Sequence, residues 1–234
     1  MAEKIMVGSI EILIKRKRIK NIYLSISAFD GQVSVSAPFN VGKEALKIMT
    51  LEKLPWLERH LARINGLGQL DPINYSAGEK LFLWGKPYEL ELVVKQKRSI
   101  EVKGNGLTLS RKIDDGFIEK EKMVNNWYRK CLQEKLTIFV DKWEKIIGVK
   151  ANEVRIKNMK SRWGSCNIRA KRLWFNLQLA KKPLEGLEYV VVHELIHLLA
   201  EKHDWVFFSY LTKYMPDWRQ REEVLNRPNE QKRI

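Results

Sequence analysis

The first hundred residues alternate apolar and polar positions in short runs, which is the pattern of half-buried β-strands. Asp30 and Gly31 stand between two such runs, and Asp-Gly is a strong signal for a hairpin turn. Residues 42–64 instead repeat apolar positions at helical spacing, with a break or kink expected at Pro55. Residues 1–112 are therefore predicted to form a β-rich region with one helix. Its strands are expected at 10–16, 21–27, 32–38, 80–85, 88–94, 99–104 and 107–111.

The pattern changes to helical spacing after residue 112. Residues 118–147 predict one long helix that ends at Gly148, a residue type suited to the left-handed conformation at helix ends. Apolar runs at 153–158 and 172–179 predict strands, and another helix is expected to begin after Pro183. Residues 113–234 thus form a second, α+β domain in this interpretation. The buried stripe of the long helix is predicted to consist of Met123, Trp127, Leu132, Leu136, Phe139, Val140, Trp143 and Ile147.

The composition indicates a folded protein with hydrophobic cores. Of the 234 residues 44% are hydrophobic and 30% are charged, and no run approaches the roughly 18 consecutive apolar residues of a membrane span. The N-terminus lacks the apolar core of a cleavable signal, and Cys131 and Cys166 form no CxxC pair, so we expect a cytoplasmic protein without a membrane partner. The net charge of +15 favours either plain solubility or non-specific contact with nucleic acid, because no base-reading motif accompanies it.

Three of the four histidines lie within residues 190–203, in the sequence VVVHELIHLLAEKH. On a helix His193 and His197 are four residues apart, so their imidazoles project from one face and can bind the same metal ion. Glu194 is placed beside them to activate a water molecule. A buried helix can also carry histidines with ordinary partners, but two imidazoles and a carboxylate without partners would cost roughly 1–3 kcal/mol per group. A bound cation removes that cost, so the segment predicts a hydrolase-type zinc site.

A catalytic zinc ion usually takes three protein ligands and keeps its fourth position for water. His203 is the leading candidate for the third ligand, and Glu222 or Glu223 are acidic alternatives. An unbroken helix would point His203 away from the metal, so we expect the helix to end near residues 200–202 with a non-glycine residue in the left-handed conformation. Asp204 would either orient a ligand histidine or cap the helix that follows.

Several motifs together resemble the YgjP-like metallopeptidase family of bacteria and archaea, which is related to the SprT-like zincins. They are NMKSRWGSC at 158–166, LWFNLQL at 173–179, YVVVHELIHLL at 189–199 with the following His203, and YMPDW at 214–218. The resemblance extends upstream into the β-rich region and so covers nearly the whole chain. It implies a zincin-like α+β fold in which His193, His197 and His203 hold zinc and Glu194 is the general base.

The reaction predicted on this basis is hydrolysis of peptide bonds by a water molecule that zinc activates and Glu194 deprotonates. The strand at 172–179 precedes the metal helix and is a candidate to pair with an extended peptide substrate. Arg162, like Lys160, is placed to stabilise the transition state. The alternative for Arg162 is a structural stack with Trp163 that fixes the loop. Asn176 is expected to contact either the metal helix or the substrate.

Two alternative functions use the same metal site. A nucleotide phosphohydrolase would use Lys157, Lys160 and Arg162 to neutralise phosphate groups, so its substrate would be a nucleotide in place of a polypeptide. A basic nucleic-acid-binding module would instead hold structural zinc, which calls for a closed site of four ligands with Cys166 as the fourth. The sequence predicts no particular oligomeric state.

Overall fold

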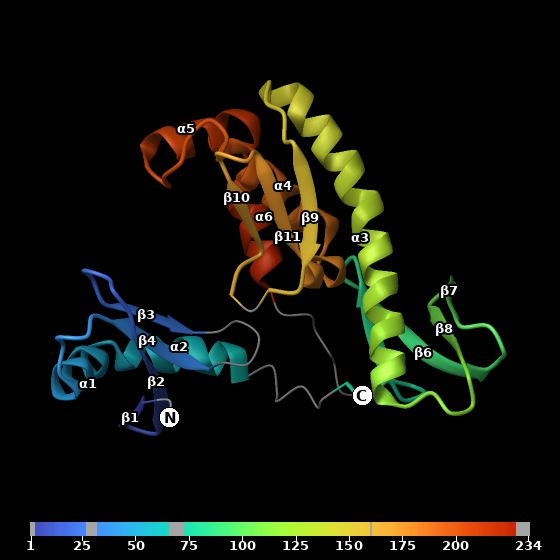
Figure 1. Ribbon diagram of the computed structural model, residues 1–234, viewed down its shortest axis with the longest axis horizontal. Helices are drawn as coiled ribbons and strands as arrows, with labels where there is room; N and C mark the ends of the chain where they lie inside the picture. Colours follow the sequence, from blue (N-terminus) through green and yellow to red (C-terminus); the bar gives the residue numbers. More distant parts are fainter. Residues whose placement is uncertain (1–2, 27–31, 66–72, 160, 228–234) are drawn as a thin grey trace. The chain divides into compact units, whose positions relative to one another are not determined.

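The computed structural model describes residues 3–26, 32–65, 73–159 and 161–227, and the chain divides into two compact units, Met1–Asp71 and Pro72–Ile234 (Figure 1). The sequence prediction placed the boundary after residue 112 instead. The strands between residues 80 and 111 belong to the second unit because their buried leucines, such as Leu90 and Leu107, share one hydrophobic core with the long helix that follows them. The change of pattern at residue 112 therefore marks a change of secondary structure within one unit.

The first unit is a four-stranded sheet packed against two helices. Strands β1 (Glu3–Val7), β2 (Ile10–Arg16), β3 (Tyr23–Ile26) and β4 (Val33–Ala37) lie in the order β1-β2-β4-β3. The central pair β2 and β4 is parallel, and both outer pairs are antiparallel. Helices α1 (Lys43–Glu52) and α2 (Leu54–Asn65) are separated next to Pro55, where the sequence predicted a break.

The alternation of apolar residues sets the core of this first unit. Ile12 of β2 and Val35 of β4 are fully buried, and they pack in one cluster with Leu46 of α1 and Leu57 of α2. Strands β3 and β4 are antiparallel, as a hairpin between them requires, while the predicted Asp30-Gly31 turn lies outside the described residues. Strand β1 has no counterpart among the predicted strands.

The second unit begins with another four-stranded sheet. All four strands predicted here are confirmed, as β5 (Lys80–Leu83), β6 (Lys86–Val94), β7 (Ser99–Lys103) and β8 (Gly106–Arg111). Their order β5-β6-β8-β7, with a parallel central pair and antiparallel outer pairs, repeats the arrangement of the first sheet. The chain thus uses one sheet topology twice, once in each unit.

Helix α3 (Phe117–Ile147) is the long helix that the sequence predicted, and it ends at Gly148 in the left-handed conformation with φ of 80°. Its buried stripe differs from the prediction at Met123, Trp127 and Phe139, which are only partly buried. The stripe advances in steps of three or four residues, which keeps one face of the helix against the core. Its members are Val124, Tyr128, Leu132, Leu136, Val140, Trp143 and Ile147.

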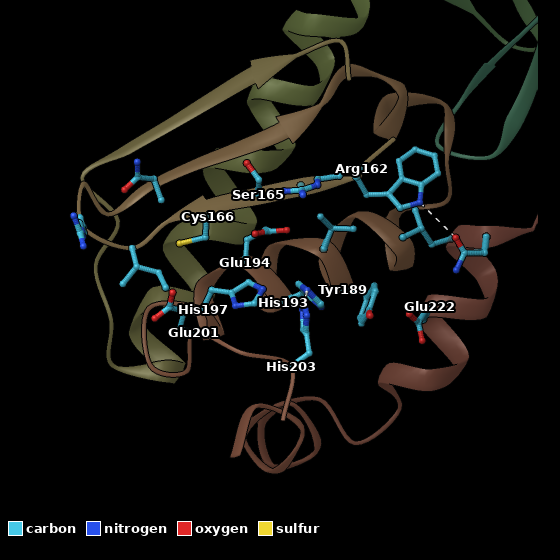
Figure 2. Close-up of a pocket in the computed structure, with 18 residues that line it drawn as sticks. Arg162, Ser165, Cys166, Tyr189, His193, Glu194, His197, Glu201, His203 and Glu222 are labelled. Carbon is cyan, nitrogen blue, oxygen red and sulfur yellow. Dashed lines mark hydrogen bonds between the residues drawn. The ribbon is translucent and has the colours of Figure 1, made fainter. Parts of the chain in front are cut away.

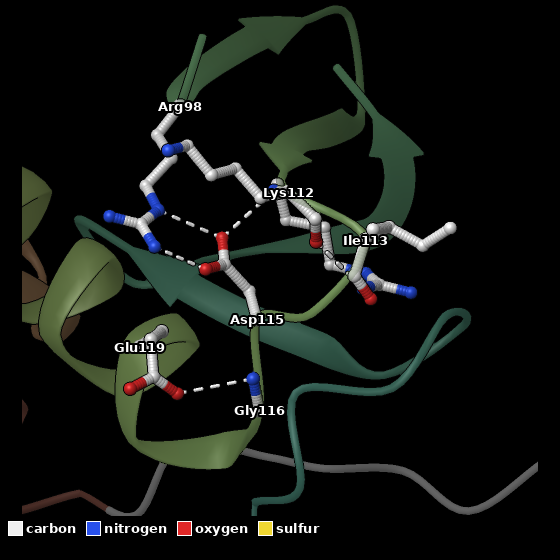
Figure 3. A network of polar contacts seen from close by, with 7 residues as sticks. Arg98, Lys112, Ile113, Asp115, Gly116 and Glu119 are labelled. Carbon is white, nitrogen blue, oxygen red and sulfur yellow. Dashed lines mark hydrogen bonds and ion pairs between the residues drawn. The ribbon is translucent and has the colours of Figure 1, made fainter. Parts of the chain in front are cut away.

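The junction between β8 and α3 is fixed by a buried carboxylate (Figure 3). Asp115 accepts hydrogen bonds from both ends of the Arg98 guanidinium, and its Oδ2 also accepts from the main-chain N–H of Lys112 at 2.9 Å. This guanidinium holds the pKa of Asp115 at about 2. Glu119 accepts from the main-chain N–H of Gly116 at 3.1 Å, which satisfies a donor at the start of α3.

A three-stranded sheet and three helices complete the second unit. Strands β9 (Glu153–Lys157), β10 (Gly164–Asn167) and β11 (Arg172–Asn176) lie in the order β10-β11-β9. A short 3-10 helix, η1 (Leu177–Lys181), replaces the last part of the strand predicted at 172–179. The helices are α4 (Leu184–Ile196), α5 (Trp205–Tyr214) and α6 (Trp218–Asn226).

Helix α4 crosses the core of the second unit and packs against α3, α6 and β10. It begins directly after Pro183, as predicted, and residues such as Val191, Val192, Leu195 and Ile196 are fully buried. The mixed sheets and the helices that cover them form the predicted α+β, zincin-like fold. None of the described helices has the length and apolar character needed to cross a membrane.

Candidate metal centre

The regular part of α4 ends at Ile196, just before the second histidine of the motif. His197 caps the helix with helical φ and ψ angles, and tight turns continue to Ala200, whose main-chain N–H donates to the oxygen of Ile196 at 2.9 Å. The helix thus ends earlier than the predicted residues 200–202. The expectation of a left-handed residue was wrong, because none of residues 197–203 has a positive φ. Successive tight turns reverse the chain without that strain.

Asp204 caps helix α5 and so fixes where the returning chain goes. Its carboxylate accepts from the main-chain N–H groups of Val206 at 3.1 Å and Phe207 at 3.3 Å. This confirms the capping alternative, since the hydrogen bonds of Asp204 go to the helix start. The residue before it, His203, is consequently brought back toward α4.

His193, His197 and His203 converge on one point (Figure 2). One ligand atom from each lies within 4.8 Å of the other two, and the Nε2 atoms of His193 and His203 are 2.9 Å apart. Two nitrogen ligands at a tetrahedral zinc ion would be separated by about 3.3 Å, given Zn–N distances of roughly 2.0–2.1 Å. The buried ring of Phe207 lies 4.7–4.9 Å from all three imidazoles, measured between ring centroids, and supports the cluster.

The hydrogen bonds of the imidazoles suit metal ligands. His197 Nδ1 lies 3.1 Å from the main-chain oxygen of Ala200, a contact that leaves its Nε2 for a cation. His193 Nδ1 is buried without a hydrogen-bond partner, and burial together with the two neighbouring histidines lowers the pKa of His193 to about 3. The imidazole is therefore neutral at physiological pH, which is the form that binds metal ions.

Glu194 lies beside the histidines with its side chain turned toward β10 (Figure 2). The residue is 5% exposed, and its Oε2 atom is buried without a hydrogen-bond partner. Burial raises the pKa of Glu194 to about 8, and the positive charge of Arg162 partly opposes that rise. A buried, unpaired carboxyl next to three imidazoles is the donor set that a divalent cation fits, because the cation offsets the cost of burial.

These groups lie in a cleft of about 880 Å³ between α4, α6 and the strand β10. Arg162, Trp163 and Arg169 line it on the β10 side, and Tyr189 and Glu222 line it on the helical side. Strand β10 was not among the strands predicted from the sequence. The cleft has room for an extended chain beside the metal site.

Asn176 is the main residue whose role the sequence did not reveal. Its side chain is fully buried, and Nδ2 donates to the main-chain oxygens of Met159 at 2.9 Å and Arg162 at 2.8 Å. Its Oδ1 accepts from the main-chain N–H groups of Met159 at 3.3 Å and Gln178 at 3.1 Å. Three of these bonds run to the loop before β10 and the fourth to Gln178 of η1, and none of the four runs to the metal helix. Asn176 therefore fixes the loop that carries Arg162.

The acidic alternatives for the third ligand lie elsewhere. Glu222 lines the cleft but is no member of the metal-binding group of the described residues, and Glu223 is exposed and pairs with Arg227 at 3.6 Å. Cys166 also lines the cleft, and burial raises the pKa of its thiol to about 11. The Cys166 sulfur is no member of the group of ligand atoms that the three histidines form among the described residues. Lys160 lies outside the described residues.

Comparison with known proteins assigns the family. The sequence profile described as YgjP-like, metallopeptidase domain, matches residues 20–228. The chain belongs to the YgjP-like metallopeptidase family. Membership of this family makes the protein a metal-dependent peptidase, and the predicted resemblance is confirmed.

Two of the similar solved structures are crystal structures of archaeal metallopeptidase zymogens. The zymogen of Pyrococcus abyssi abylysin is 22% identical with a TM-score of 0.35, and the match covers 38% of this chain and 89% of that one. The zymogen of Methanocaldococcus jannaschii jannalysin is 23% identical with a TM-score of 0.34, over 38% of this chain and 90% of that one. No curated protein matched the chain.

Proposed function

We propose that this YgjP-like protein is a zinc-dependent peptidase in which His193, His197 and His203 hold the zinc ion and Glu194 is the general base. The observation that carries the proposal is the convergence of three imidazoles beside a buried carboxylate with an unpartnered oxygen. Three histidines suit zinc and leave a coordination position open. When bound, zinc would polarise the substrate carbonyl and lower the pKa of a water molecule at the site to roughly 7.

Glu194 is placed to take a proton from the attacking water and to deliver it to the leaving amine. The contact with Gly164 fixes one side of the carboxylate, and the unpartnered Oε2 atom remains for proton transfer. Arg162 is exposed in the same cleft and close enough for its charge to act on Glu194. We assign to Arg162 the stabilisation of the negative oxygen that develops during attack.

Strand β10 is the element that we propose binds the main chain of a polypeptide. The sequence prediction assigned this role to the strand at 172–179, but β11 is paired on both sides, with β10 and with β9. Among the described strands β10 has only β11 as a neighbour, and its residues Gly164–Asn167 line the cleft. An extended peptide can add to such an edge through main-chain hydrogen bonds without strict sequence selection.

The two alternative functions receive little support from this arrangement. Of the two described residues that were predicted to neutralise phosphates, Lys157 lies outside the cleft lining and Arg162 belongs to it, together with Arg169, Glu194, Glu201 and Glu222. A structural zinc site would need a fourth protein ligand, and Cys166 does not belong to the metal-binding group of the described residues. Peptide hydrolysis is the function that the family and the cleft favour together.

The test is cleavage of an unfolded polypeptide by zinc-loaded protein, followed by mass spectrometry of the products. We expect new chain ends with the wild type and a rate at least about 100-fold lower with Glu194→Gln at equal zinc content. Glu185→Gln, an exposed position on the same helix α4, is the matched control and should keep wild-type activity. A Glu194→Gln variant as active as the wild type, or phosphate release from nucleoside triphosphates without any peptide cleavage, would contradict the proposal.

A further inference from the structure

Glu222 lines the cleft but is not one of the proposed metal ligands. It lies on α6, and Tyr189 of α4 stands between it and His193 (Figure 2). The Tyr189 ring contacts the imidazole of His193 edge-on at 5.7 Å between centroids, and Tyr189 lies close enough to Glu222 for the two side chains to interact electrostatically. Glu222 is therefore held about one side chain away from the metal position, facing the same cleft.

The carboxylate of Glu222 forms no ion pair with the described residues, although the chain carries 43 lysines and arginines against 28 acidic residues. The basic residues of α6 and its C-terminal end are each engaged with another group. Those groups are Asp217 and Glu188 for Arg221, Glu223 for Arg227, and the ring of Trp218 for Arg219.

Lys182, which packs on the ring of the cleft residue Trp163, is also engaged with another group. Lys182 donates to the main-chain oxygen of Arg227 at 2.6 Å, and its Nζ atom lies 5.6 Å from the centroid of the Trp163 ring. The structure thus leaves Glu222 without an ion pair among the described residues, in the wall that a substrate would contact. A ligand with a positively charged group would form an ion pair with the Glu222 carboxylate.

The neighbours of Glu222 suit a long basic side chain. Leu225, Val190, Trp163 and Asn226 also line the cleft, and the Trp163 indole N–H donates to the Asn226 amide oxygen at 3.4 Å. Lysine and arginine bury their aliphatic stems on apolar surface and extend the charge to an anion beyond it. A neutral side chain of the same length would fill the space but leave the carboxylate unpaired.

We propose that Glu222, which lies beside Tyr189 in the cleft lining, forms a subsite that selects a lysine or arginine side chain of the polypeptide substrate. This inference rests on the proposed peptidase function and specifies which side chain of the substrate the peptidase prefers. A partly buried ion pair of this kind should give about a tenfold preference for a basic residue over a neutral one at one position relative to the cleaved bond.

The experiment is digestion of a mixed peptide library by the zinc-loaded protein, with the cleavage positions read by mass spectrometry. We expect enrichment of lysine and arginine at one position with the wild type, loss of that enrichment with Glu222→Gln, and a shift toward acidic residues with Glu222→Lys. The matched control is Glu223→Gln, the adjacent exposed position, which should keep the wild-type preference.

A binding measurement separates recognition from turnover. The zinc-loaded Glu194→Gln protein should bind a lysine peptide about tenfold more tightly than the same peptide with norleucine, and adding Glu222→Gln should remove the difference. Cleavage without a basic preference, or a preference that Glu222→Gln leaves intact, would overturn the subsite while the peptidase function stands. Absence of all cleavage by the wild type would overturn the proposed function and the subsite with it.

Discussion

Gly164 of β10 lies directly against the side chain of Glu194 on α4. A Cβ atom at residue 164 would be 2.5 Å from Oε1 of Glu194, 2.7 Å from its Cγ and 2.9 Å from its Cδ. The position of Gly164 in the Arg-Trp-Gly-Ser-Cys sequence therefore has no room for a Cβ atom unless Glu194 moves. The lack of a side chain at residue 164 lets β10 approach the proposed base closely. One contact therefore positions two parts of the proposed site. They are the strand β10, which we propose binds the substrate, and Glu194, which we propose transfers the proton.

Gly164→Ala is expected to displace the Glu194 side chain. The added methyl group should lower the free energy of unfolding by about 1–3 kcal/mol, as overpacking of a core does, and should lower kcat for peptide hydrolysis. In a Glu194→Ala background all three clashing atoms are gone, so the same substitution should cost well under 1 kcal/mol. Urea unfolding of the four proteins in this cycle gives the answer. Equal costs in both backgrounds would show that Gly164 serves another purpose.

Asn176→Ala should loosen the loop that carries Arg162. The substitution removes four side-chain hydrogen bonds at a buried position, so we expect a loss of roughly 2–4 kcal/mol in the free energy of unfolding. Asn158→Ala removes one exposed bond to Gln178 and is the control, with an expected change under about 0.5 kcal/mol. Hydrogen exchange should become faster for the amides of Met159 and Gln178 in Asn176→Ala. Unchanged protection of both amides would contradict this role of Asn176.

Replacing His203 and Glu222 in turn tests which of the two is the third metal ligand. His203→Ala should weaken zinc binding by at least about 100-fold, because a three-ligand site becomes a two-ligand site. Glu222→Gln should leave the zinc affinity within about threefold of the wild type, since Glu222 stands beyond Tyr189 and outside the histidine cluster. Competition with a chromophoric chelator measures both. The reverse order of effects would make Glu222 the ligand.

The Asp115–Arg98 pair predicts a specific loss of stability in acid. The pKa of Asp115 is about 2 in the folded chain against 3.8 for a free aspartate, so the folded state favours the charged form. This contribution is present above about pH 4 and is lost as the pH falls toward 2. Urea unfolding between pH 5 and 2 should show a shallower decline for Asp115→Asn than for the wild type. The exposed Asp114→Asn should follow the wild type.

Much of the site could be predicted from the sequence because its signals are local. The spacing of His193 and His197 on a buried helix, the start of α4 after Pro183 and the cap at Asp204 each depend on residues within a few positions of one another. The third histidine was also found, although the turn that delivers it uses ordinary backbone angles where a left-handed residue had been expected.

The features that were missed depend on contacts between distant segments. Strand β10 is short and lacks alternating apolar residues, so only its pairing with β11 reveals it. The domain boundary was misplaced because Leu90 and Leu107 share a core with α3, which the pattern within each strand does not show. Asn176 likewise bonds to residues 14 and 17 positions earlier in the chain. Long-range pairing of this kind leaves no periodic signal in one sequence.

The coordination of zinc in the loaded protein tests the central claim most directly. X-ray absorption at the zinc edge should show three imidazole nitrogens at roughly 2.0–2.1 Å with one further light atom, and no sulfur. His203→Ala should reduce the imidazole count to two, and Cys166→Ser should leave the spectrum unchanged. A sulfur atom at about 2.3 Å that disappears in Cys166→Ser would mean a closed structural site and would contradict the account.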